Sequence, residues 1–230
     1  MSLILYDLAG ADPARRFSPY CWRVRLAIEH KGLSVETIPW RFTDKDVIAF
    51  SGQGLVPVLV DSGQTVAGSW AIANHLEETY PERPSLFSRR GGKVFARYME
   101  FWTDNALMPG LMPLIIVDLF NHLHETDRDY FRSSREQKLG MSLERAGAHR
   151  ESRLIEFQRS LELLRNTLRT QPFLDGDEPN YADYIVFSGF MWARCVSPFK
   201  LLENDDPVAV WRSHLLQRFD IARNAPGYDT

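Results

Sequence analysis

The chain changes character at about residue 81. Before that point, short apolar runs typical of strands alternate with segments of helical spacing, and after it the patterned segments all have helical spacing. Alternating strands and helices indicate an α/β unit, whereas helical segments alone indicate an all-α unit. The sequence therefore predicts an α/β domain over residues 1–81 and an all-helical domain over residues 93–230. A linker rich in proline and glycine, residues 82–92, joins them.

Turn and cap signals divide the first domain into short elements. Gly32 is placed to stop a helix, and Ser62-Gly63 is placed to join two antiparallel strands. In chain order we expect a strand over Leu3–Leu8, a helix over Pro19–Lys31, a strand over Val35–Pro39, one or two helical turns over Asp44–Phe50, strands over Pro57–Asp61 and Gln64–Ala67, and a helix over Ser69–Thr79.

The second domain is expected to consist of long helices. The pattern from residue 93 to about 123 contains Pro109, Gly110 and Pro113, which predict a kink or a break. Three further helices are expected over residues 135–170, 180–196 and 208–219. At the start of the helix expected over residues 180–196, Asn180 and Asp183 fit a capping box, so their expected role is folding.

Charge and hydropathy exclude several classes of protein. The net charge of −3 provides no overall basic field for nucleic acid or for a lipid surface. The uncharged and strongly apolar run Ala106–Val117 is shorter than the roughly 18 residues of a membrane span. The first residues lack the basic segment of a secretory signal. We therefore expect a cytoplasmic protein that binds neither nucleic acid nor a membrane.

Cysteine and histidine give no metal signal. The two cysteines, Cys21 and Cys195, lie far apart, which argues against a disulfide framework and against metal-type spacing. His122 and His124 are two residues apart and fall on different faces of a helix. We expect no bound metal, and we expect Cys21 to be a small buried hydrophobe.

The segment from Ser18 to Arg25 (SPYCWRVR) follows the first strand and has two interpretations. Serine before proline is the preferred pair for a helix cap and first helical position, because the hydroxyl accepts a free backbone N–H and proline has none. The same helix start also attracts an anion, since it carries about half a positive charge. This segment alone favours the capping interpretation, and the anion-binding interpretation stays open.

Four segments in this order resemble the soluble glutathione transferase superfamily over nearly the whole chain. They are SPYCWRVR from Ser18, Val56-Pro57, Gly68-Ser69-Trp70-Ala71-Ile72, and Asn180-Tyr181-Ala182-Asp183. The resemblance implies a thioredoxin-like α/β N-terminal domain, an all-α C-terminal domain, a homodimer and glutathione as co-substrate. The serine in the first segment resembles serine-type members such as the zeta class and the bacterial β-etherase group, and residues 131–144 resemble the β-etherase side.

The resemblance assigns Ser18 as the residue that stabilises the glutathione thiolate. A free thiol has a pKa of about 8.5, and lowering it by about two units requires roughly 2.7 kcal/mol. A hydroxyl that donates to a charged sulfur supplies about 1.5–3 kcal/mol, and a helix start supplies about 0.3–2 kcal/mol. One serine at a helix N-terminus is therefore sufficient, and no general base on the protein is required.

Further glutathione contacts follow from the same resemblance. Val56 would present its backbone to the cysteinyl part beside a cis Pro57, whereas a trans Pro57 that opens a strand is the alternative. Ser69 would bind the γ-glutamyl carboxylate, and its alternative role is an ordinary N-cap. The family usually has an acidic residue where this chain has Gly68, so the partner of the glutathione α-amine is missing. Tyr20 and Gln53 complete the expected contacts. Gln53 and Lys45 are candidates for contacts near the glycyl end of glutathione, and the alternative for both is a solvated position in a loop.

The expected function is a glutathione transferase that activates the thiol for attack on a hydrophobic electrophile, with aryl-ether cleavage as one such reaction. A zeta-like isomerase that uses glutathione as a transient nucleophile is an alternative. A non-catalytic binding protein of the same fold is a second alternative, which Gly68 favours. Tyr98, Trp102 and Met112 are candidates for lining the electrophile pocket, although their spacing favours ordinary core packing.

Overall fold

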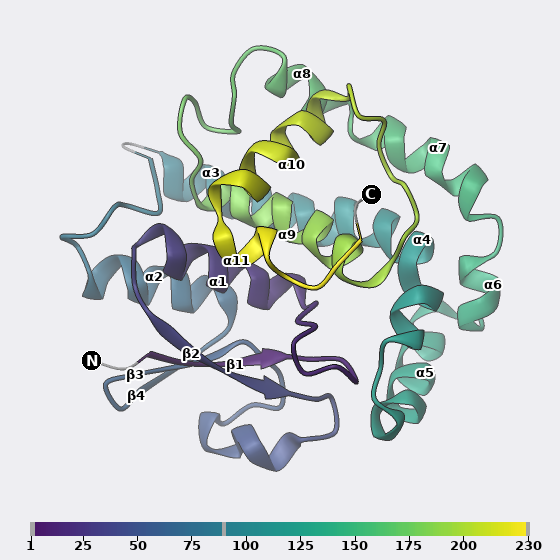
Figure 1. Cartoon of the computed structure of the whole chain (residues 1–230), viewed down its shortest axis with the longest axis horizontal. Coiled ribbons are helices and arrows are strands. Elements are labelled where there is room, and N and C mark those ends of the chain that lie inside the picture. The colour runs from purple at the N-terminus through teal and green to yellow at the C-terminus, as the bar shows by residue number, and fades with distance from the viewer. Residues whose placement is uncertain (1–2, 89–90, 229–230) are drawn as a thin grey trace.

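A four-stranded sheet lies beneath two helices of its own domain and the helical domain (Figure 1). The computed structural model describes residues 3–88 and 91–228. The thioredoxin-like domain consists of β1 (Leu3–Leu8), α1 (Pro19–His30), β2 (Val35–Trp40), the 3₁₀ helix η1 (Lys45–Ser51), β3 (Val58–Asp61), β4 (Gln64–Ala67) and α2 (Ser69–Thr79). These bounds confirm the expected elements to within one or two residues.

Strand order and direction bring three loops to one edge of the sheet. The order is β2-β1-β3-β4, with β1 parallel to β2 and antiparallel to β3. Tyr6 near the end of β1 pairs with Val58 at the start of β3, and Val58 pairs with Ala67 at the end of β4. The segments that lead into α1, into β3 and into α2 therefore meet at the same edge.

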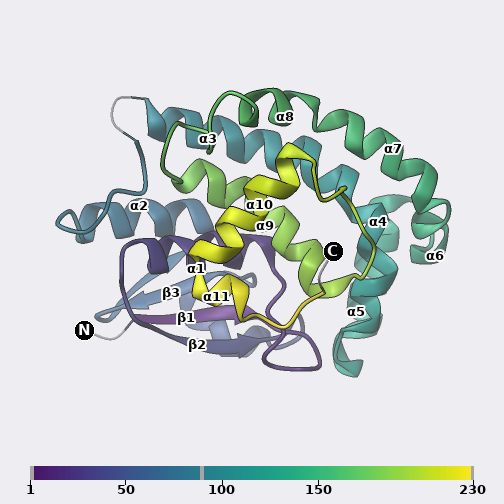
Figure 2. The same ribbon diagram turned by 45° about the horizontal axis from the view of Figure 1, so that its top comes forward.

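The helical domain is built around one buried helix. Figure 2 shows α9 (Tyr181–Val196) between α1 and α3, and all but one of its residues are buried. The expected capping box at its start is present: Asn180 caps the first turn, and Asp183 accepts the backbone N–H of Asn180 at 3.1 Å. The other helical elements are α3 (Gly92–Trp102), the π-helix η2 (Thr103–Leu107), α4 (Met108–Asn121), α5 (Glu125–Leu139), α6 (Leu143–Gly147), α7 (Arg150–Ser160), α8 (Glu162–Leu168), α10 (Pro207–Arg218) and α11 (Asp220–Arg223).

The long helices differ from the expected pattern in two places. Of the kink or break expected near Pro109, the break does not occur, because α3, η2 and α4 follow one another without interruption; the irregularity there is a π-helical stretch just before the proline. The single helix expected over residues 135–170 is instead divided among the end of α5, α6, α7 and α8. Gly140 ends α5 in the left-handed region, and His149 adopts φ +60° before α7, so a continuous helix cannot pass either residue.

The helical run Gly92–Asn121 has the length and composition of a membrane span. Its most apolar 18-residue window has a mean hydropathy of 1.2, and 44% of that window is buried in the protein. Core helices of soluble proteins meet the same two criteria, so the run is weak evidence for a membrane segment.

Buried polar contacts join the two domains. Asp127 at the start of α5 accepts the backbone N–H groups of Phe42 and Thr43 at 3.2 and 3.0 Å. His30 at the end of α1 contacts the Tyr184 hydroxyl of α9 at 2.7 Å. These contacts fix the helical domain against both ends of the α/β domain.

Candidate functional site

Ser18 occupies the N-cap of α1 at the loop-bearing edge of the sheet. Its hydroxyl oxygen accepts the backbone N–H of Cys21 at 3.4 Å, and only 5% of the residue is exposed. This hydrogen bond uses a lone pair of the oxygen and leaves the hydroxyl proton available for donation. The capping and anion-stabilising roles of Ser18 are therefore compatible in this geometry.

Val56-Pro57 and Gly68 form a second part of the same edge. The Val56-Pro57 peptide bond is cis, as the sequence resemblance implied, and the Pro57 carbonyl accepts the N–H of Gly68 at 3.0 Å. The turn before β3 is thus fixed directly against the start of α2.

Gly68, and not Ser69, is the N-cap of α2. Gly68 has φ +90°, which glycine adopts without strain, and a side chain at this position would meet no atom within 4 Å. Ser69 is the first helical residue, so its alternative role as an N-cap was wrong. The Ser69 carbonyl accepts the Tyr181 hydroxyl at 2.9 Å, which joins the start of α2 to α9.

The other expected contacts lie on two sides of this edge. Tyr20 is 40% exposed on α1, and its ring lies 4.6 Å from the Arg23 guanidinium. Gln53 is half-buried in the loop after η1. Lys45 of η1 donates to the Gly54 carbonyl at 2.5 Å, and its ammonium lies 4.9 Å from the centre of the Trp40 ring. Lys45 is thus held against the loop that carries Gln53.

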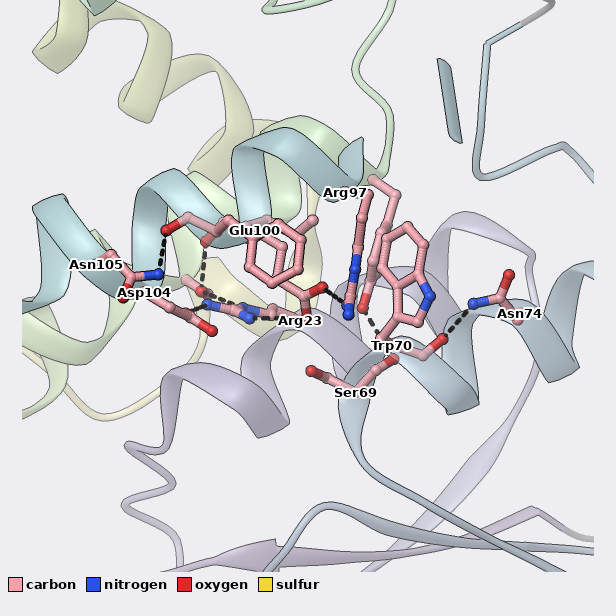
Figure 3. Close-up of polar contacts among 12 residues, drawn as sticks. Arg23, Ser69, Trp70, Asn74, Arg97, Glu100, Asp104 and Asn105 are labelled. Carbon is pink, nitrogen blue, oxygen red and sulfur yellow. Dashed lines mark hydrogen bonds and ion pairs between the residues drawn. The ribbon is translucent and has the colours of Figure 1, made fainter. Parts of the chain in front are cut away.

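An ion-pair cluster centred on the buried Arg23 lies beside Ser69 and Trp70 (Figure 3). Arg23 of α1 is fully buried; it contacts Glu100 of α3 at 3.5 Å and Asp104 of η2 at 2.5 Å. Arg97 pairs with Glu100, and its guanidinium lies 4.8 Å from the centre of the Trp70 ring. Burial raises the pKa of Glu100, and the two arginines oppose this change. Two positive and two negative groups balance one another, so the cluster locks α1, α2 and α3 together.

Neither this cluster nor a role for Asp7 in β1 was predicted from the sequence. Arg23 and its acidic partners are 77 and 81 residues apart, and no local pattern connects them. Asp7 was read only as part of an apolar strand, yet its carboxylate is fully buried and lies 3.7 Å from both Arg16 and Arg25. Arg23 and Asp7 are each a charged residue between apolar neighbours in the sequence. This pattern could have indicated that both side chains are buried and paired.

Cys21 is a buried hydrophobe, as expected. It is inaccessible to solvent, and burial raises the pKa of its thiol well above the usual range. Trp102 and Met112 pack against the core, whereas Tyr98 is 65% exposed on α3. Across residues 3–88 and 91–228, no group of three or more His, Cys, Asp or Glu side chains is arranged to hold a metal ion.

Comparison with known proteins agrees with this architecture. Residues 14–84 match the family model described as "Glutathione S-transferase, N-terminal domain", and residues 95–218 match "Glutathione S-transferase, C-terminal domain". The chain belongs to the glutathione S-transferase family. Each model matches most of one of the two domains.

Related sequences are named as glutathione S-transferases, and one of them as a zeta-class member. Glutathione S-transferase Z2 of Arabidopsis thaliana is 32% identical over 108 residues, which are 45% of this chain and 47% of the relative. A zeta-class glutathione S-transferase of Euphorbia esula is 30% identical over 110 residues, 45% of this chain and 47% of the relative. The matched region thus spans about half the length of these curated relatives.

Solved structures of the family share the fold over the whole chain. A glutathione S-transferase of Ceriporiopsis subvermispora, solved in complex with glutathione, has a TM-score of 0.85 at 22% identity and is covered to 99%, as is this chain. Glutathione transferase GSTFuA3 of Phanerochaete chrysosporium has a TM-score of 0.84 at 24% identity, with 96% of this chain and 97% of that chain covered.

Proposed function

We propose that the chain is a serine-type glutathione transferase in which Ser18 stabilises the thiolate of bound glutathione. The observation that carries the proposal is the position of the Ser18 hydroxyl, which accepts the cap hydrogen bond and keeps its proton for a ligand. The cis Val56-Pro57 turn and the start of α2 lie at the same edge of the sheet. A peptide thiol bound there would place its sulfur at the N-terminus of α1.

The proposed contacts divide glutathione into three parts. The backbone of Val56 pairs with the cysteinyl part, and the free N–H groups at the start of α2, with Ser69, bind the γ-glutamyl carboxylate. Lys45 and Gln53 lie at the loop that precedes the Val56-Pro57 turn, and we assign them to the glycyl carboxylate. Tyr20, exposed on the first turn of α1, borders the sulfur position.

Gly68 leaves the glutathione α-amine without an acidic partner at that position. A second copy of the chain is a source of that partner. Val94, Tyr98 and Phe101 lie on one face of α3 and are 76%, 65% and 54% exposed. Phe101 contacts Arg97, and Arg97 in turn stacks on Trp70 beside the start of α2. We infer that this apolar stripe, Val94-Tyr98-Phe101, is the homodimer contact.

The electrophile is proposed to be a hydrophobic small molecule, with an aryl ether as one candidate. In that reaction the thiolate attacks the carbon of the C–O bond, a thioether forms, and the phenolate leaves. A zeta-like isomerase is the second candidate, supported by the zeta-class name of one related sequence. The third candidate, a non-catalytic binding protein, rests on Gly68. Two free, buried cysteines fit the reducing cytoplasm as the proposed location.

The test measures the pKa of the thiol of bound glutathione. The titration is monitored by the ultraviolet difference absorbance of the thiolate. We expect binding at millimolar glutathione and a thiol pKa well below its solution value. If nothing binds, or if bound thiol titrates as it does in solution, the transferase proposal fails.

Two Ser18 variants separate chemistry from helix capping. Both Ser18→Gly and Ser18→Ala lack the hydroxyl, but glycine is nearly as good a cap, whereas alanine costs about 0.5–2 kcal/mol of stability. We expect both variants to lose thiolate absorbance and to lower kcat/KM by about 10- to 150-fold, the equivalent of about 1.5–3 kcal/mol. Near-normal activity in a stable Ser18→Gly variant would contradict the role of Ser18.

A further inference from the structure

Arg135 of α5 is a half-buried cation without an acidic partner. Its guanidinium lies 4.8 Å from the centre of the Phe131 ring and 5.5 Å from that of the Phe42 ring, and it donates to the Ser134 hydroxyl at 3.1 Å. It forms no ion pair with a carboxylate of any described residue, whereas Arg132, one turn earlier, pairs with two glutamates at 2.9 Å. Burial lowers the pKa of Arg135. A partly buried charge without a counter-charge is costly, so an anion that reaches Arg135 is stabilised there.

Aromatic rings connect Arg135 with the loop that leads into α1. The centre of the Phe42 ring lies 6.5 Å from that of Phe17 and 6.1 Å from that of Tyr130. Phe17 immediately precedes Ser18, and Tyr130 is 38% exposed on α5. A continuous group of rings therefore extends from the surroundings of Ser18 to Arg135. Apolar walls with one charged group at the end suit a ligand that has an aromatic body and a negative charge.

Lys45 is the second cation of this region. Its ammonium lies 5.4 Å from the centre of the Tyr130 ring and 4.9 Å from that of the Trp40 ring, and it too forms no ion pair within the part of the chain that the structure describes. The proposed function assigns Lys45 to the glycyl carboxylate of glutathione. With glutathione bound, the charge of Lys45 is balanced and that of Arg135 is not. A further carboxylate beside Arg135 would complete the balance.

We propose that Arg135 binds a carboxylate of the electrophile, so that the substrate is an aromatic acid. The inference rests on the proposed function and names its substrate class. The aromatic body would lie along Tyr130, with its reactive carbon toward Ser18 and its carboxylate toward Arg135. The thiolate attacks that carbon and forms a C–S bond, and the leaving group departs with the electron pair of the broken bond. Arg135 transfers no proton in this step; it holds the carboxylate.

A matched pair of electrophiles tests the inference. The compound 4-chloro-3-nitrobenzoate carries the carboxylate, and 4-chloro-3-nitrobenzamide has the same ring, the same chloride leaving group and no charge. Each kcat/KM is divided by the rate constant of the same electrophile with free glutathione, which corrects for intrinsic reactivity. We expect the wild type to favour the benzoate by about 10- to 150-fold, the range for a hydrogen bond to a charged group. Equal corrected values for the two electrophiles would overturn the inference.

Variants on α5 assign the preference to Arg135. Arg135→Met keeps the length of the side chain and removes its charge, so kcat/KM for the benzoate should fall by about 10- to 150-fold, chiefly through KM, while the value for the benzamide is unchanged. Arg135→Lys should restore part of the benzoate activity. Arg128→Met removes an exposed guanidinium from the same helix and is the control. An equal loss with both electrophiles in a folded Arg135→Met variant would contradict the carboxylate contact.

Glutathione with its glycyl carboxylate blocked as the ethyl ester distinguishes two sources of the carboxylate. If Arg135→Met weakens the binding of glutathione but not of the ester, Arg135 binds the glycyl carboxylate and the inference is wrong. Thiolate formation and reaction of the benzamide, without preference for the benzoate, would support the proposed function and refute the carboxylate site. Absence of thiolate in the wild type would refute the proposed function, and the inference with it.

Discussion

His30 joins three segments of the chain through the two nitrogens of one ring. Nε2 contacts the Ser85 carbonyl at 2.9 Å, and Nδ1 contacts the Tyr184 hydroxyl at 2.7 Å. The carbonyl can only accept, so Nε2 carries the proton of the neutral ring, and Nδ1 then accepts from the tyrosine hydroxyl, which also lies 3.2 Å from the Pro179 carbonyl. Burial lowers the pKa of His30 in the folded protein. The neutral ring is therefore part of the contact between the domains.

This burial predicts a loss of stability in mild acid. Below about pH 6.5 the unfolded chain binds a proton at His30 that the folded chain binds less readily, so the free energy of unfolding falls as pH falls. His30→Gln preserves a donor and an acceptor but does not titrate, so the slope of stability against pH between about 5 and 6.5 should be smaller. Urea unfolding at several pH values measures it. Exposed His214 on α10 provides the control, His214→Gln, and equal slopes in wild type and His30→Gln would contradict the prediction.

At the scale of elements, the bounds of a helix or strand were predicted accurately where turn or cap residues lie next to its ends. The strands β1 and β4 and the helix α2 have the expected bounds, because turns and caps next to them mark their ends. The breaks within residues 135–170 depend on left-handed residues, and His149 is one that sequence does not mark. Periodicity continues across such breaks, so it predicted one helix where the structure has several.

The capping box of α9 gives a prediction about folding. The Asp183 carboxylate accepts from the backbone of Asn180 and Leu174 and from the Trp211 indole at 2.8–3.1 Å. Asp183→Ala leaves these donors unpaired and should lower the free energy of unfolding by about 2–4 kcal/mol, without selectively removing thiolate formation. Thermal unfolding and thiolate absorbance measure the two effects, with exposed Asp177→Ala as the control. A stable Asp183→Ala variant that lacks glutathione affinity would refute a purely structural role.

At the scale of the whole molecule, local patterns identified the loops at the sheet edge but not the partners beneath them. Ser18, Val56-Pro57 and Ser69 each carry a signal within a few residues. Asp7, Arg23 and Asp127 obtain their surroundings from segments brought close only by folding. Packing within the α/β domain around Asp7, and packing of the helical domain against it at Arg23 and Asp127, therefore determine the part of the candidate site that the sequence did not reveal.

The apolar stripe Val94-Tyr98-Phe101 predicts the oligomeric state. A charge on this stripe would be buried in a homodimer, so Tyr98→Glu should shift the protein toward the monomer in sedimentation velocity. Leu163→Glu, at a residue 75% exposed on α8, places the same charge away from the stripe and should leave the dimer intact. A monomeric wild type, or an unchanged dimer in Tyr98→Glu, would show that the stripe is not the contact.

The gathering of three loops at one sheet edge has a consequence for the opposite edge. The β3–β4 turn at Ser62-Gly63 is exposed and lies at the other end of both strands from Pro57 and Gly68. Exposed turns of this kind tolerate inserted sequence well. A fluorescent reporter or an affinity peptide can therefore be placed between Ser62 and Gly63 while the residues proposed to hold glutathione keep their surroundings.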